Sequence, residues 1–192
     1  MTIFLILAPF GSFALLMLVT TAEVSLFASA AICLAVIGFD VVRDRSIKML
    51  GAGCVVVFAG IGGYVTLIDP NLSSSAVKLT TDIGVLLISL TSLIIRKPFV
   101  LQYAREAVDA ETAKLPGFLK ATYIITWAWT AAFVLMIAGN VLTIYVPGLP
   151  LWSGLVIAFA ARNSAAYFTT WYPQYRKAKY GAAPANALPG TN

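Results

Sequence analysis

Residues Phe118 to Val146 read FLKATYIITWAWTAAFVLMIAGNVLTIYV, and Lys120 is the only charged residue among them. A transmembrane helix needs about 20 mainly apolar residues, so this run is long enough to cross a bilayer. The rest of the chain of 192 residues has the same character, because 60% of its residues are hydrophobic and 11% are charged. An ordinary soluble domain carries about 25% charged residues. This composition predicts a protein embedded in a membrane.

Five further apolar runs are separated by short polar or turn-forming segments, such as Asp69-Pro70-Asn71 and the Pro-Gly-Leu-Pro sequence at 147–150. The first run has no preceding basic residues and no small-residue cleavage site, so we expect a retained span and not a signal peptide. The pattern predicts an all-α integral membrane bundle of six transmembrane helices over residues 1–171. Residues 172–192 are expected to form a cytoplasmic tail whose end is disordered. The predicted spans are residues 3–20, 24–39, 49–68, 79–95, 118–146 and 151–171.

Basic residues gather in alternate loops, and loops rich in lysine and arginine stay on the cytoplasmic side of a membrane. With a cytoplasmic amino terminus, 11 of the 13 basic residues fall in cytoplasmic segments, Lys78 falls on the far side, and Arg162 lies within a span. We therefore expect a multi-pass protein of the bacterial inner (plasma) membrane with both termini in the cytoplasm. The cytoplasmic set is Arg43, Arg45, Lys48, Arg96, Lys97, Arg105, Lys114, Lys120, Arg176, Lys177 and Lys179.

The longest polar stretch connects the fourth and fifth spans. From Pro98 to Leu115 (PFVLQYAREAVDAETAKL), apolar residues recur at helical spacing opposite polar ones. This predicts a short amphipathic connector helix on the cytoplasmic leaflet. The helix is either a packed connector between spans or a surface for a partner or for lipid. The second interpretation assigns the contact to Phe99, Tyr103, Arg105 and Val108.

Arg162 lies near the middle of the sixth span, in the sequence AFAARNSAAY, with Asn163 beside it. An arginine at the centre of a bilayer costs roughly 2.5–3.5 kcal/mol, so its side chain is expected to face protein or water. Asp82 in the fourth span and Asn140 in the fifth are its candidate partners. The set is a structural clamp between helices, a site for an ion, a proton or an anionic substrate, or a contact with a lipid headgroup or partner subunit.

Small residues on the sixth span follow helical spacing, which allows helices to approach closely in lipid. We expect Gly154, Ala158, Ala161 and Ala165 to pack against another helix, within this chain or in a larger complex. Cys33 and Cys54 are interpreted as inert core residues, because free cysteine is commonly buried.

The sequence lacks the residue types that several kinds of catalytic and binding site require. The chain has no histidine, which removes the usual ligands of haem, zinc and copper and the usual proton shuttle at neutral pH. It has no nucleotide-binding glycine loop, and its positive charge fits membrane topology better than nucleic acid. We expect no catalytic residues, no metal site, no cofactor and no nucleic-acid partner.

The region from Arg45 through Tyr145 resembles the intracellular septation protein A family of small bacterial inner-membrane proteins. The resemblance lies in the basic loop, the Asp69-Pro70-Asn71 break, the Arg96-Lys97-Pro98 exit from the fourth span, Trp129, and the Gly139-Asn140 pair. Where the family has a Trp-Lys pair before the fourth span, this chain has Val77-Lys78. The resemblance implies a non-enzymatic envelope protein that associates with division or wall-synthesis complexes, and it names no catalytic residues.

The leading expectation is therefore a membrane scaffold or accessory subunit. Its partners would be membrane lipids and other inner-membrane proteins or a larger membrane complex. The alternative is a small multi-span transporter or channel that uses the polar residues around Arg162.

Overall fold

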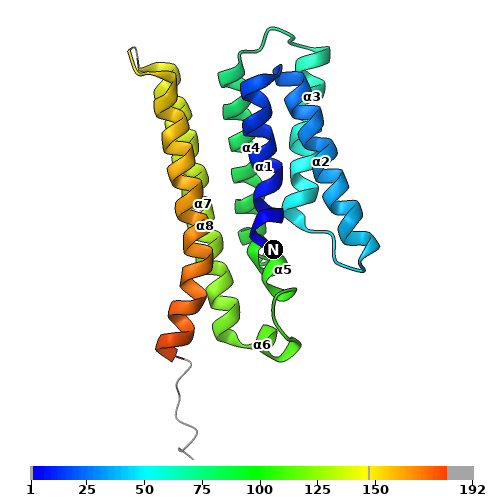
Figure 1. The fold of residues 1–192 in the computed structure, drawn as a ribbon, viewed down its shortest axis with the longest axis vertical. Helices are drawn as coiled ribbons and strands as arrows, with labels where there is room; N and C mark the ends of the chain where they lie inside the picture. Colours follow the sequence, from blue (N-terminus) through cyan, green and yellow to red (C-terminus); the bar gives the residue numbers. More distant parts are fainter. Residues whose placement is uncertain (1, 147, 181–192) are drawn as a thin grey trace, which may run out of the picture.

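The computed structural model describes residues 2–146 and 148–180, and the side chains of these except residues 2–10, 151 and 180. This part of the chain is all-helical and contains no strand. Figure 1 shows a bundle of long helices with two short helices at one end. The helices are α1 (Thr2–Val19), α2 (Ala22–Val42), α3 (Met49–Leu67), α4 (Ser74–Ile94), α5 (Phe99–Arg105), α6 (Ala110–Lys114), α7 (Pro116–Tyr145) and α8 (Leu151–Tyr180).

Within the described residues, four helices are long and apolar enough to cross a membrane, namely α2, α3, α4 and α7. The long helices alternate in direction (Figure 1), so their connections gather at two ends of the bundle. We call one end the basic end: it contains residues 43–48, α5, α6 and the carboxyl end of α8. Of the described residues, the opposite end contains 20–21, 68–73, 146 and 148–150. All eleven basic residues assigned to cytoplasmic segments belong to elements at or near the basic end.

Helix caps explain why the second and fourth helices are longer than the hydropathy pattern predicts. The side chain of Thr21 accepts a hydrogen bond from the amide of Val24, and α2 begins at Ala22, not at the predicted residue 24. Ser73 likewise accepts from the amide of Ala76, so α4 begins five residues before the predicted start at residue 79. Lys78 is therefore a helical residue and not the end of a loop.

Two of the helices that run toward the basic end, α2 and α4, are each followed by a residue in the left-handed conformation. Asp44 (φ 53°) follows α2 and Arg96 (φ 56°) follows α4. The amides of Arg43 and Arg45 both donate to the carbonyl of Asp40 in the last turn of α2. The second helix thus extends past its predicted end at residue 39 and includes Asp40.

The connector between α4 and α7 corrects the prediction of one amphipathic helix lying on the leaflet. It forms two short helices, α5 and α6, separated by residues 106–109. Phe99 is 0% and Tyr103 is 5% exposed, because α5 packs inward against α7. These two side chains are core residues and not a free surface for a partner or lipid, whereas Arg105 is exposed and Val108 is half-buried.

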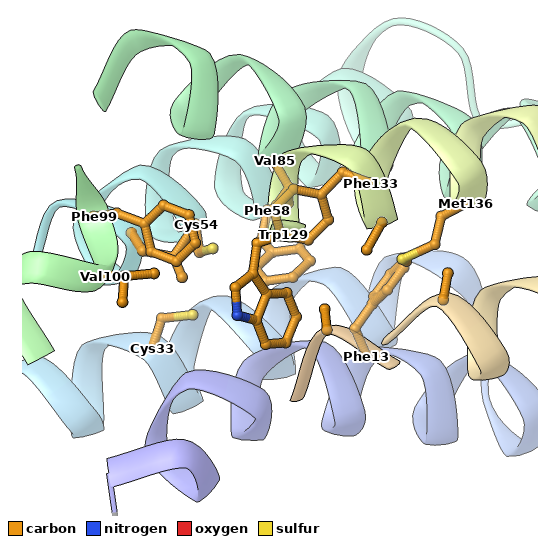
Figure 2. Packing of buried hydrophobic residues seen from close by; sticks show 14 of the residues in the cluster. Phe13, Cys33, Cys54, Phe58, Val85, Phe99, Val100, Trp129, Phe133 and Met136 are labelled. Atoms are coloured by element: carbon orange, nitrogen blue, oxygen red, sulfur yellow. The ribbon is translucent and has the colours of Figure 1, made fainter. Parts of the chain in front are cut away.

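The core lies where α2, α3, α4 and α7 meet, with α1 packed beside them. The rings of Trp129 and Phe133 of α7 are tilted against each other with centroids 5.9 Å apart, and the ring centroid of Phe13 of α1 lies 5.3 Å from that of Phe58 of α3 (Figure 2). Hydroxyls join helices inside this core, since the Ser89 and Thr130 oxygens lie 2.7 Å apart between α4 and α7. Both hydroxyls are buried from water, and this bond satisfies them.

Helix α8 packs mainly on α7, and small residues allow the close contact. A Cβ added to Gly154 would lie 2.8 Å from Cγ2 of Thr143 and 3.3 Å from the carbonyl oxygen of Gly139. Ala161 and Ala165 are buried on the same helix, and Ala158 is half-buried. The helix continues to Tyr180, so the predicted boundary at residue 171 lies inside a helix. The expectation of disorder at the end of the tail concerns residues 181–192, which lie outside the described residues.

Candidate functional site: a polar cavity between four helices

Four helices, α1, α4, α7 and α8, surround a small cavity of about 70 Å³. Its polar lining consists of Lys78 and Asp82 from α4, Asn140 from α7 and Arg162 from α8. Apolar side chains including Phe13 and Met136 complete the wall. A volume of this size holds several waters or one small ion. We call these four polar residues and their space the polar cavity.

The tightest contact in the polar cavity joins α4 to α7. Asn140 Nδ2 donates a hydrogen bond of 2.6 Å to Oδ2 of Asp82. The backbone carbonyl of Asn140 also accepts from Oγ1 of Thr143 at 2.8 Å, one turn along the same helix. The hydrogen bond from Asn140 holds the Asp82 carboxylate, which lines the cavity, in position against α7.

Arg162 and Lys78 have no salt bridge to any described residue, although both line the polar cavity. Their positive charges act on Asp82 through space rather than through a direct ion pair. The polar cavity therefore contains two cationic side chains, one carboxylate and one amide. With ordinary charge states, the side chains facing it sum to one positive charge.

The four polar residues lie at different depths from the opposite end of the bundle. With a rise of 1.5 Å per residue, Lys78 lies about 6 Å and Asp82 about 12 Å along α4 from its first residue. Asn140 lies about 8 Å from the last residue of α7, and Arg162 about 16 Å from the first residue of α8. The earlier start of α4 places Asp82 deeper than the predicted span did, which brings it close to the level of Arg162.

Large buried side chains fill the bundle on the basic-end side of the polar cavity. Trp129 lies eleven residues before Asn140 on α7 and is 2% exposed, and Phe133 lies between them (Figure 2). Trp129 Nε1 donates a 2.9 Å hydrogen bond to Oγ1 of Thr169, which ties α7 to α8 at this level. We call Trp129 and Phe133 the aromatic layer; they pack the α7 side of the bundle between the polar cavity and the basic end.

A second group of charges lies at the basic end, around the buried pair Asp40 and Lys48. Lys48 Nζ lies 2.6 Å from Oδ2 of Asp40 and 3.2 Å from Oε1 of Glu106, and it sits 5.3 Å from the centre of the Tyr103 ring. Arg45 is more distant, at 3.9 Å from Asp40 and 4.0 Å from Glu106. These charges balance to zero and join the end of α2, the 43–48 loop and the α5–α6 connector. We call this group the buried charge cluster.

The residues around the buried charge cluster connect helices to one another, which indicates a structural role. Burial, followed in size by the nearby cysteines and carboxylates, raises the pKa of the Tyr103 hydroxyl above its ordinary value. Gln102 also accepts a 2.6 Å hydrogen bond from the amide of Met49, which ties α5 to the start of α3. Among the described residues, no three histidine, cysteine, aspartate or glutamate side chains group as a metal site.

The structure brings together three of the four residues that the sequence nominated around the sixth span, Asp82, Asn140 and Arg162. Asn163 is not among them, because it is exposed and donates to the carbonyl of Phe159 on its own helix. Sequence reasoning missed Lys78 in the polar cavity. The signal was Ser73, an N-cap residue that moves the helix start outward and places Lys78 within the helix.

Cys33 of α2 and Cys54 of α3 lie across from each other, and both are 1% exposed (Figure 2). The sequence shows them as separate residues in two apolar runs, and only the pairing of the two helices brings them together.

Comparison of the chain with protein-family models, with curated proteins and with solved structures gives no match. The polar cavity therefore has to be interpreted from its own geometry.

Proposed function

We propose that the chain is a small membrane transport protein that binds a polar or ionic solute at the polar cavity. One observation carries the proposal: Lys78, Asp82 and Arg162 face one space together with Asn140, from three different helices. A charged side chain deep in a bilayer costs roughly 2.5–3.5 kcal/mol and is usually found where an ion or substrate passes. Two cations without a salt bridge are a poor structural clamp, since a clamp would pair them directly.

The proposed protein crosses the membrane six times. Helix α1 has 18 residues and α8 has 30, so at 1.5 Å per residue both reach about 27 Å or more, close to the thickness of the hydrocarbon core. Arg162 reduces the apolar character of α8, but its side chain faces the polar cavity and not lipid. The basic end is assigned to the cytoplasm of a bacterial inner membrane, with both termini on that side.

In this proposal the solute reaches the polar cavity from the opposite end, where Lys78 lies nearest to the surface. The aromatic layer around Trp129 closes the way toward the basic end. Passage then requires a second arrangement in which the α7–α8 hairpin moves relative to α1 and α4, as in other proteins that expose one central site to each side in turn. The hydrogen bond between Asn140 and Asp82 crosses the interface that would move.

Flux through purified protein in sealed vesicles tests the proposal. Proteoliposomes with internal dyes report the movement of sodium, protons, chloride and acetate, and Asp82→Asn and Arg162→Gln are compared with the unmodified chain. Asn163→Ala is the matched control, because it changes the neighbouring residue on α8 and does not touch the polar cavity. We expect the unmodified chain to carry a measurable flux. Both cavity variants should change this flux by at least about tenfold, and the control should leave it unchanged. Equal flux in empty vesicles and in all variants rejects the proposal.

A second candidate function is a scaffold or accessory subunit of a larger membrane complex. The observation in its favour is an apolar groove of about 540 Å³ between α7 and α8, lined mainly by alanines. Ala131, Ala160 and Ser164 in this groove are exposed, so a helix of another protein can approach closely in lipid. An envelope or division complex, as the septation family resemblance implies, belongs to this second candidate.

Gentle native extraction followed by mass spectrometry tests the second candidate. A stoichiometric partner should be recovered with the unmodified chain and lost with Ala160→Leu, which fills the groove. Val156→Leu is the control, because Val156 is exposed on α8 and does not line the groove. Recovery of the chain alone under every gentle condition contradicts the scaffold.

A further inference from the structure

We propose that the ligand of the polar cavity is a small monovalent anion, such as a halide or a short carboxylate. This inference rests on the proposed function, because it names the class of solute that the same site takes. It adds the sign of the charge and the size of the ligand, neither of which follows from the presence of a polar site in a membrane.

The sign follows from the charges that face the space. Lys78 and Arg162 contribute two positive charges and Asp82 one negative charge, and no other ionisable side chain lines the polar cavity among the described residues. The Asp82 carboxylate is also partly engaged, since one of its oxygens accepts from Asn140. A single added negative charge would neutralise the group, and an added cation would raise it to two unbalanced positive charges.

Donors for an anion are present without any rearrangement. The Lys78 ammonium carries three N–H donors and the Arg162 guanidinium carries five, and neither is used in a salt bridge or hydrogen bond to a described residue. Asn140 uses its amide nitrogen toward Asp82 and has a further N–H. Charge-assisted hydrogen bonds from such donors are about twice as strong as neutral ones.

The size follows from the volume. About 70 Å³ accommodates a dehydrated halide or a carboxylate of a few heavy atoms, and it excludes a sugar acid or a nucleotide. The wall also contains Phe13, Met136 and Leu155, which leaves little room for a second polar group.

The cations of the polar cavity would also attract the phosphate of an anionic lipid at the opposite end, where Lys78 lies close to the surface. We assign the free anion, because Arg162 lies about 16 Å from that end and a headgroup phosphate has to stay near the interface.

Thermal unfolding of the full chain in uncharged detergent tests the assignment. Sodium chloride, sodium nitrate and sodium acetate are titrated at constant ionic strength, with sodium gluconate as the replacing salt because gluconate is too large for the cavity. A ligand that binds only the folded protein raises its melting temperature in a saturable way. We expect a saturable rise of a few degrees with the small anions and none with gluconate.

Two variants test whether the ligand of the polar cavity is negatively charged. Asp82→Asn keeps the size of the side chain and removes the competing negative charge, so it should tighten the apparent affinity for chloride or acetate by about tenfold. Lys78→Gln should weaken it by about tenfold, and Lys97→Gln, an exposed lysine at the basic end, should leave it unchanged. These variants keep the test valid where Arg162→Gln fails to fold.

Three results overturn the inference. They are the absence of a small-anion effect, a loss of the effect in Asp82→Asn, and stabilisation by phosphatidylglycerol alone, which would identify a lipid headgroup as the ligand. The flux measurement separates this inference from the proposed function. Anion binding without flux removes the transport proposal and keeps the anion site. Flux of sodium or protons without anion binding keeps the transport proposal and removes the anion site.

Discussion

Lys48 Nζ lies 2.6 Å from Oδ2 of Asp40, and the two side chains are 4% and 3% exposed. The pair joins the residue just before α3 to the last turn of α2, at the basic end. Glu106 from the α4–α7 connector approaches the same ammonium at 3.2 Å, so one buried lysine joins the α2–α3 turn to a connector that is distant in sequence. The other Asp40 oxygen is buried without a hydrogen bond, which makes this cluster sensitive to any loss of positive charge.

Replacing Lys48 by methionine should destabilise the fold by about 3–5 kcal/mol, because it leaves Asp40 as a buried charge without its partner. Chemical unfolding in micelles, followed by circular dichroism, measures the change. Asp40→Leu added to Lys48→Met should recover most of the lost stability, since it removes the orphaned charge. Lys114→Gln breaks an exposed pair with Glu111 and should cost less than about 1 kcal/mol. A single variant as stable as the unmodified chain would show that the buried pair contributes nothing.

Gly154→Ala should loosen the α7–α8 hairpin, because the new Cβ would lie 2.8 Å from Cγ2 of Thr143. Overpacking of this kind costs typically about 1–3 kcal/mol, and thermal unfolding in detergent measures it. Gly63→Ala is the control, since a Cβ at that position of α3 meets nothing within 4 Å. Thr143→Ser removes the obstructing methyl group, so the double variant should regain stability. If the double variant does not regain stability, the contact with Thr143 is not the cause of the destabilisation.

The start of α6 should depend on pH through Asp109. Hydrogen bonds from the backbone amide and the hydroxyl of Thr112 lower the pKa of the Asp109 carboxyl below its ordinary value. A lowered folded-state pKa contributes stability above the unfolded pKa of about 3.9, and this contribution is lost as the pH falls through the folded value. Amide exchange at Thr112 should therefore speed up in acid, after correction for intrinsic exchange. Asp109→Asn keeps the cap and should remove the pH dependence; the same acid response in this variant would exclude Asp109 as its source.

Accessibility labelling should place the 43–48 loop and the α4–α5 turn on the same side of the membrane. Single cysteines at Ser46 and Lys97, in a chain with Cys33 and Cys54 replaced by alanine, should react with an impermeant maleimide only from the cytoplasmic side. A cysteine at Ser74, at the opposite end, should react only from the other side. Labelling of positions 46 and 97 from opposite sides would contradict the alternating arrangement of helices.

The polar cavity was only partly predictable. Arg162 stands out in the sequence because a charge within an apolar run has a large transfer cost, and that cost nominates Asp82 and Asn140 as partners. Lys78 does not stand out, because hydropathy places it in a loop. Its position in the helix depends on the capping hydrogen bond at Ser73, and its position at the cavity depends on how α4 rotates against α7 and α8.

The connector shows a second limit of the same kind. Helical periodicity marks Phe99 and Tyr103 as one apolar face, and this grouping is present in the structure. Periodicity does not say whether such a face meets lipid, a partner or the chain's own core. Packing of α5 against α7 and the buried Lys48 below the Tyr103 ring decide this in favour of the core.

Composition and the order of apolar runs determined that this protein is helical and has helices able to cross a membrane, because burying a backbone in lipid leaves few other solutions. The distribution of lysine and arginine also marked which helix ends belong together. Only the tertiary structure decided which polar side chains share a space, since side chains meet through helix rotation, close approach at glycine and capped helix starts. Those features depend on contacts between residues far apart in the chain, and no local pattern records them.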